Sequence, residues 1–114
     1  MAIAELYSGT EAVSTTEHSL TTDTAGPDAD TTDGVFQVFL DVSDMIAGDQ
    51  LQIRIYEKVR SGDTQRIVYE SILTGAQAQP IWVSPSLVLM HGWDVTLDAL
   101  AGTITVNWSI RQVA

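Results

Sequence analysis

Strict alternation of apolar and polar residues is the feature that most restricts what this chain can fold into. It is clearest in the segment TITVNWSIR, where every second residue is large and apolar. Successive side chains of a β-strand point to opposite faces of a sheet, so this segment predicts a strand that covers a hydrophobic core with one face only. The predicted core residues of this strand are Ile104, Val106, Trp108 and Ile110.

The same period of two recurs along most of the chain, in VFQVFLDV, LQIRIYEKV, QRIVYESIL and HGWDVTL. Turn-forming residues separate these segments, as is typical of all-β domains. We therefore predict an all-β fold, an antiparallel β-sandwich or small barrel of about seven or eight strands. A chain of 114 residues suits one domain, which we assign to residues 34–114. Residues 1–33 contain few large apolar side chains and are predicted to form an irregular acidic N-terminal arm.

One predicted hairpin, LQIRIYEKV followed by RSGDT and QRIVYESIL, carries four of the five basic residues of the chain. The chain has fifteen acidic residues and a net charge of -10. Two interpretations stay open: these cations form a solvated face that offsets nearby acids, or they dock the hairpin on an acidic protein surface. The candidate contact residues are the cations Arg54, Lys58, Arg60 and Arg66, together with Phe39, an apolar residue on a predicted polar face.

The strong negative charge also restricts the possible partners. Binding a nucleic-acid backbone depends on a patch of cations, so we expect no nucleic acid as a ligand. No segment approaches the roughly 20 apolar residues that span a bilayer, and MAIAELYSGTEAV lacks the basic and long apolar regions of a secretion signal. We therefore expect neither membrane insertion nor Sec export.

The acidic segment DTAGPDADTTDG is the one candidate metal loop, because Asp28, Asp30 and Asp33 offer hard oxygen ligands. The EF-hand pattern fails when counted from Asp28, since its fifth position is Thr32 and its twelfth is Phe39. We expect a turn-rich, mobile connection that holds no metal, and a calcium site of another kind stays open.

No pattern in the sequence points to catalysis. There is no cysteine, no nucleophile elbow and no phosphate-binding glycine loop, so we predict a protein that is not an enzyme, with no catalytic residues and no cofactor. One ligand hypothesis comes from the aromatic residues, which could stack on a sugar. The alternation places Trp93 and Trp108 in the core and leaves Tyr56 and Trp82 as the possible ligand-facing aromatics.

The phrases YEKV, WVSPSL and GWD, within a pattern that covers about residues 32–114, resemble small uncharacterised structural proteins of tailed bacteriophages. This resemblance implies a virion component made in the host cytoplasm, and the small acidic all-β examples look like capsid decoration, or cement, proteins on the outer head surface. It implies two kinds of partner: the major capsid protein and other copies of the chain, for which a trimer is one arrangement. A neck or tail component and a carbohydrate-binding module on the virion remain alternatives. No functional residue is carried over.

Overall fold

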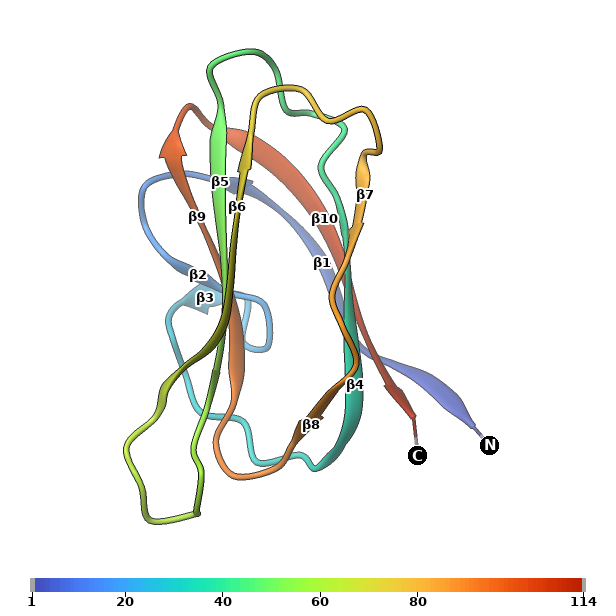
Figure 1. Cartoon of the computed structure of the whole chain (residues 1–114), viewed down its shortest axis with the longest axis vertical. Coiled ribbons are helices and arrows are strands. Elements are labelled where there is room, and N and C mark those ends of the chain that lie inside the picture. Colours follow the sequence, from blue (N-terminus) through green and yellow to red (C-terminus); the bar gives the residue numbers. More distant parts are fainter. Residues whose placement is uncertain (1, 114) are drawn as a thin grey trace.

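The computed structural model describes residues 2–113 and consists of two antiparallel five-stranded sheets packed face to face (Figure 1). Sheet A has the order β1-β10-β4-β7, with β8 also paired to β4, and sheet B has the order β3-β2-β9-β5-β6. The strands are β1 (Ile3–Val13), β2 (His18–Ser19), β3 (Thr24–Ala25), β4 (Gly34–Asp41), β5 (Gln50–Glu57), β6 (Arg66–Thr74), β7 (Ile81–Val83), β8 (Leu87–Leu89), β9 (Asp94–Ala101) and β10 (Ile104–Val113).

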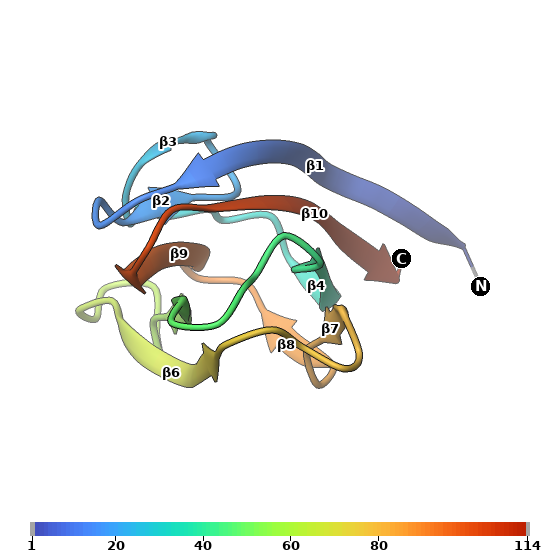
Figure 2. The same cartoon turned by 90° about the horizontal axis from the view of Figure 1, so that it is seen from above.

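The chain passes repeatedly from one sheet to the other. The strands β1, β4, β7, β8 and β10 lie in sheet A. The pair β2–β3, the pair β5–β6 and the single strand β9, which come between them in the chain, lie in sheet B, and this is the connectivity of a jelly roll. Figure 2 shows the two layers from above, with β6 and β7 at neighbouring borders of their sheets. The predicted all-β sandwich is therefore confirmed, and it has ten strands, two of them only two residues long.

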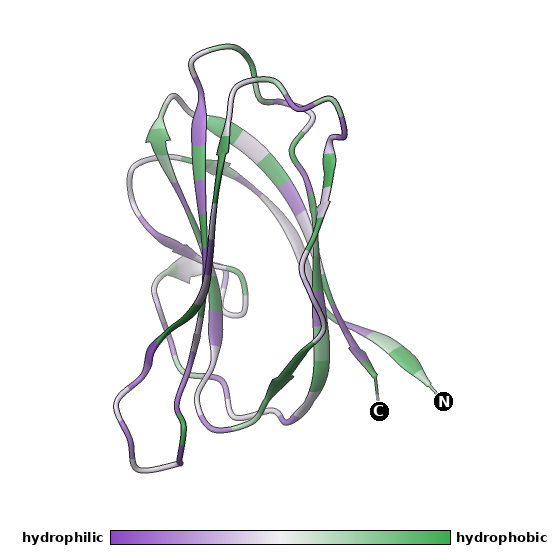
Figure 3. Cartoon of the chain, viewed as in Figure 1, coloured by the Kyte–Doolittle hydropathy of each residue, from purple (hydrophilic) through white to green (hydrophobic). Residues whose placement is uncertain are grey.

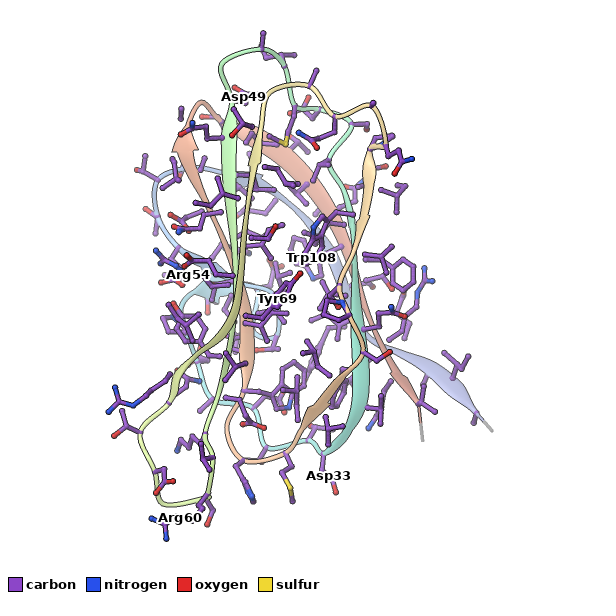
Figure 4. All side chains as sticks on the ribbon, viewed as in Figure 1. Asp33, Asp49, Arg54, Arg60, Tyr69 and Trp108 are labelled. Carbon is purple, nitrogen blue, oxygen red and sulfur yellow. The ribbon has the colours of Figure 1, made fainter. Side chains whose placement is uncertain are left out.

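The core lies between the sheets and follows the predicted alternation. Trp108 and Ile110 of β10 are buried, as are the inward residues of β4, β5 and β9. Hydrophobic and hydrophilic bands alternate along the strands in Figure 3. Figure 4 shows Trp108 and Tyr69 pointing into the space between the two sheets. Pro85 separates β7 from β8, as expected for a residue that cannot donate to a sheet ladder.

The prediction of an irregular arm over residues 1–33 is wrong for most of that segment. β1 pairs with β10 in antiparallel register from Ile3 opposite Val113 to Val13 opposite Ile104. β2 pairs with β9, and Leu20 is fully buried in the core. The first third of the chain is therefore part of the sandwich, and no domain boundary falls at residue 33.

The acidic segment that follows β3 is also held in place. The backbone N–H of Asp28 donates to Asp94 Oδ2 at 2.8 Å, and Trp93 Nε1 donates to the carbonyl oxygen of Thr32 at 2.7 Å. Asp30 and Trp93 exchange two backbone hydrogen bonds of 2.8 Å, and the Tyr7 hydroxyl donates to the Asp30 carboxylate. The acidic segment, which the sequence predicted to be a mobile connection, is thus held across one end of the sandwich by these hydrogen bonds.

Candidate functional site

The β5–β6 hairpin projects past one end of the sandwich (Figure 1). Its tip, defined here as residues 58–66, places Val59 between Lys58 and Arg60, and Val59 is 85% exposed. Arg60 lies at the far end of the hairpin, as Figure 4 shows. An apolar side chain held in water between two cations does not contribute to the core, so the tip is a candidate contact surface.

The tip cations differ in their partners. Arg60 is paired with Asp63 of the same turn through hydrogen bonds of 3.2 Å and 3.1 Å. Lys58 packs its aliphatic stem against Gly92, where a Cβ atom would lie 2.9 Å from Lys58 Cε. Within residues 2–113, neither Lys58 nor Arg66 has a carboxylate oxygen within 4.0 Å. Two of the three tip cations are therefore available to an outside partner.

The fourth predicted cation, Arg54, is not part of the tip. It lies on the outer face of sheet B, where its Nε donates to Glu70 Oε2 at 3.1 Å and its Nη1 lies 3.7 Å from Glu17 Oε2. Glu17 also accepts hydrogen bonds from the hydroxyls of Tyr56 and Thr96. Arg54 thus holds a local network together, and the predicted set of four contact cations is reduced to three.

Asp98 lies in the same network and is 91% buried, since its exposed fraction is 9%. Burial raises the pKa of its carboxyl above the usual range; Arg54 opposes this effect, and the charges of Glu17 and Glu70 add to it. Asp98 Oδ1 and Gln52 Oε1, whose residues face each other across β9 and β5, accept no hydrogen bond from the described residues. An ionised Asp98 is therefore poorly compensated at neutral pH.

We expect Asp98→Asn to raise the stability of the fold at pH 7. Because the pKa of Asp98 is raised in the folded state, its ionisation costs stability at pH values above its ordinary value of 3.8, and the amide removes that cost. The gain should shrink as the pH falls below 3.8, where the wild-type carboxyl is protonated in both states. Urea unfolding between pH 3 and pH 7 measures it.

The control for this prediction is Asp41→Asn. Hydrogen bonds from Ser43 lower the pKa of Asp41, so ionisation of this residue favours the folded state and its amide should give no gain at pH 7. An Asp98→Asn variant that is less stable than the wild type at pH 7 would contradict the proposed cost of the Asp98 charge.

Phe39, the apolar residue predicted on a polar face, lies on the outer face of sheet A and far from the hairpin in the fold. It is opposite Val83 of β7 and half-buried, and the guanidinium of Arg111 lies 3.8 Å from its ring centroid. The structure therefore does not bring Phe39 together with the tip cations. Phe39 lies instead beside exposed apolar residues of sheet A such as Val83.

The two aromatics predicted to face a ligand do not form one platform. Tyr56 is on the outer face of sheet B but only 9% exposed, because Glu17 folds over it and accepts its hydroxyl at 2.5 Å. Trp82 points inward from β7, packs against the core and lies 6.4 Å from the Tyr69 ring. One edge of Trp82 still reaches a groove of about 630 Å³ between β6 and β7, which Gln77 and Gln79 also line.

The other chemical predictions concern metals and membranes. Among residues 2–113, no group of three or more histidine, aspartate or glutamate side chains could hold a metal ion. The carboxylate of Asp28 accepts a hydrogen bond from the Thr22 hydroxyl, and that of Asp30 accepts one from the backbone N–H of Thr32. The described part of the chain contains no helix that is long and apolar enough to cross a membrane.

A buried histidine contact was not found from the sequence. His18 Nδ1 lies 3.2 Å from Glu11 Oε2 and His18 Nε2 lies 2.8 Å from Asp23 Oδ1. The ring also meets Trp108 edge-on at 5.7 Å. These contacts link β1 of sheet A to β2 of sheet B, so they stabilise the sandwich. The three residues meet because the chain turns from β1 into β2 and from β2 into β3, and no motif in the sequence indicates these turns.

Comparison with known proteins identifies no family. No protein-family model matches the chain, and no curated protein sequence is similar to it. Among solved structures, the chain is similar to a protein of Bacillus endospore appendages, which are described as a novel family of disulfide-linked pili. The TM-score is 0.53 at 12% sequence identity, and the match covers 98% of this chain and 87% of that chain. The chain is also similar to PirA, with a TM-score of 0.55 at 10% identity, and the match covers 94% of each chain. At such low identity, this chain shares with these two proteins the β-sandwich fold alone.

Proposed function

We propose that this chain is a structural protein of a bacteriophage virion, specifically a capsid decoration protein that binds the major capsid protein on the outer head surface and stabilises it. A neck or tail position would use the same kind of contact. The jelly-roll fold suits this role, since it is common in viral capsid and lectin domains. Fold alone does not define function, so the proposal rests on the hairpin tip.

The tip carries this proposal because it combines exposure, an apolar side chain and positive charge in an acidic chain. Val59 offers a small apolar contact, and Lys58, Arg60 and Arg66 offer complementarity to an acidic capsid surface. Charges at the rim of an interface set orientation and association rate more than final affinity. Many copies on a symmetric shell multiply a weak contact of this size.

We expect the triple variant Lys58→Gln, Arg60→Gln and Arg66→Gln to attach to expanded capsids about tenfold more slowly, with a flatter salt dependence. Its stability should stay within about 0.5 kcal/mol of the wild type, because Arg60 and Arg66 are exposed and glutamine keeps part of the stem that Lys58 packs against Gly92. Attachment is measured by light scattering or by sedimentation with purified capsids over a salt series.

The control variant is Asp63→Asn, which removes the acidic partner of Arg60 and leaves the tip more positive. It should speed attachment at low salt, the opposite of the triple variant. Equal attachment rates for the wild type and the triple variant across the salt series would show that the tip is not the docking surface.

A carbohydrate-binding role is the second candidate, and the groove beside Trp82 favours it. An indole edge and the side chains of Gln77 and Gln79 meet there in a space large enough for a sugar. Two results together would favour this role over decoration: the wild type binds a glycan and does not attach to capsids, and Trp82→Ala no longer binds the glycan.

A further inference from the structure

The outer face of sheet A is unusually apolar for the exposed side of a sandwich. Side chains of Ile3, Val113, Val35 and Val88 form one row across β1, β10, β4 and β8, since each is opposite the next in the strand register. Val88 is 79% exposed and Ile3 is 67% exposed. A second apolar group on the same face consists of Phe39, Ile81 and Val83, and the paired residues Gln37 and Arg111 lie between it and the row.

This set of seven residues, called here the sheet A face, does not serve the core of its own chain. The outward residues of an antiparallel sandwich are ordinarily polar, because water contacts them. A group of exposed apolar residues on one face is a common mark of a protein–protein contact.

Charge identifies the partner that the sheet A face fits. Of the outward-facing residues of the sheet A strands, only Glu5, Asp41 and Arg111 are charged, whereas the whole chain has a net charge of -10. Two copies of the chain repel each other across their acidic surfaces. They can approach closely where this repulsion is smallest, which is across the sheet A face.

The few charges on this face also complement each other in a two-fold arrangement. Glu5 and Arg111 are opposite each other in the β1–β10 ladder, and both contact Ser109: Ser109 Oγ donates to Glu5 Oε2 at 2.6 Å and Arg111 Nε donates to Ser109 Oγ at 3.3 Å. Arg111 has no carboxylate oxygen within 4.0 Å among the described residues. In a contact between identical patches, the Arg111 of each copy can meet the Glu5 of the other.

The face is large enough for a small interface between two copies. The molecule is a slab of 40 × 32 × 20 Å, so its sheets form broad faces. Sheet A is four strands wide, because β7 and β8 share the position beside β4. Four strand positions about 4.8 Å apart and about eight residues at 3.3 Å each cover about 500 Å². A standard interface buries about 800 Å² on each partner, so two such faces packed back to back supply more than half of that area.

From these observations we infer that two copies of the chain associate through their sheet A faces in a two-fold symmetric dimer. The inference is independent of the proposed capsid contact, because the hairpin tip belongs to sheet B and remains free in this arrangement. The experiment uses the purified full chain alone, so its result does not depend on the presence of capsids.

The test is sedimentation velocity of the untagged full chain over a concentration series. Tags are omitted because Ile3 and Val113, which lie close to the two ends of the chain, belong to the sheet A face. The wild type should sediment as a dimer of the 12.3 kDa chain. The double variant Val35→Glu and Val88→Glu, which adds charges at exposed positions without disturbing the core, should weaken the dimer by at least about 100-fold.

The matched control is Val68→Glu and Ile72→Glu on β6, two residues that are about as exposed but face outward from sheet B. It should leave the dimer intact. A charge test adds a second readout: Arg111→Glu should weaken the dimer, and Arg111→Glu combined with Glu5→Arg should restore it. Circular dichroism of each variant monitors folding.

Three results would overturn the inference. The first is a wild type that is monomeric at every concentration, and the second is a trimer, because a two-fold contact between identical faces does not produce one. The third is a dimer that persists in the Val35 and Val88 variant but is lost in the β6 variant. If Arg111→Glu loses the dimer and the combination with Glu5→Arg does not restore it, the proposed ion pair between the two copies is wrong.

Discussion

Trp108→Ala should lower the free energy of unfolding by about 3–5 kcal/mol, the usual cost of removing a large buried aromatic. Trp108 is 4% exposed and lies between the sheets, as Figure 4 shows. It packs so closely against β1 that a Cβ atom on Gly9 would lie 2.5 Å from its Cζ2. Its removal opens a cavity that the paired strands β1 and β10 cannot collapse into. Urea or guanidinium unfolding at pH 7 measures the loss.

The matched control is Trp82→Ala, because Trp82 is half-buried and borders a groove that is already open. Its loss should be clearly smaller than that of Trp108→Ala. If Trp108→Ala shifts the unfolding midpoint no more than Trp82→Ala does, Trp108 is not the central core residue that its position indicates.

Removal of residues 2–13 should cost about 5 kcal/mol and leave the chain largely unfolded at 37 °C. The deleted strand contributes the buried side chain of Val13 and the partly buried Leu6 and Tyr7, and burying each such side chain fully is worth about 1.5–3 kcal/mol. The deletion also removes the pairing partner of β10 and uncovers Trp108. A loss of this size matches the total stability of many small domains. Thermal unfolding followed by circular dichroism measures it.

The control is a shorter deletion of residues 2–4, which are all exposed at the start of β1. It should unfold within a few degrees of the full chain. A 2–13 deletion that keeps the full-length melting temperature would mean that β1 is a dispensable arm, as its composition alone suggested.

The strands of the core could be predicted because their alternation is local. In β4, β5 and β10, large apolar residues recur at every second position, and burying that face is the main favourable term in folding. The inward positions of Trp93, Trp108 and Ile110 follow directly from this pattern and are confirmed. The position of the hairpin tip could also be predicted, since its turn residues interrupt two alternating segments.

The pattern could not show whether the outward-facing residues Tyr56 and Arg54 are free to contact a ligand or partner. Alternation correctly places Tyr56 on the outer face of its strand, but Glu17 from a distant segment covers it. The sequence places Arg54 on the same hairpin as Lys58, Arg60 and Arg66, although the cross-strand neighbour Glu70 and the covering Glu17 hold Arg54 in a separate network.

The sequence by itself determined that this chain is an acidic all-β domain, which strand faces are buried and where the basic hairpin turns, because each of these depends on residues close together in the chain. Only the tertiary structure decided that β1 belongs to the sandwich, that the acidic loop is pinned by Asp94 and Trp93, and that Phe39 joins an apolar face. These features depend on hydrogen bonds and packing between segments far apart in sequence, whose free energy appears only when both sheets have formed.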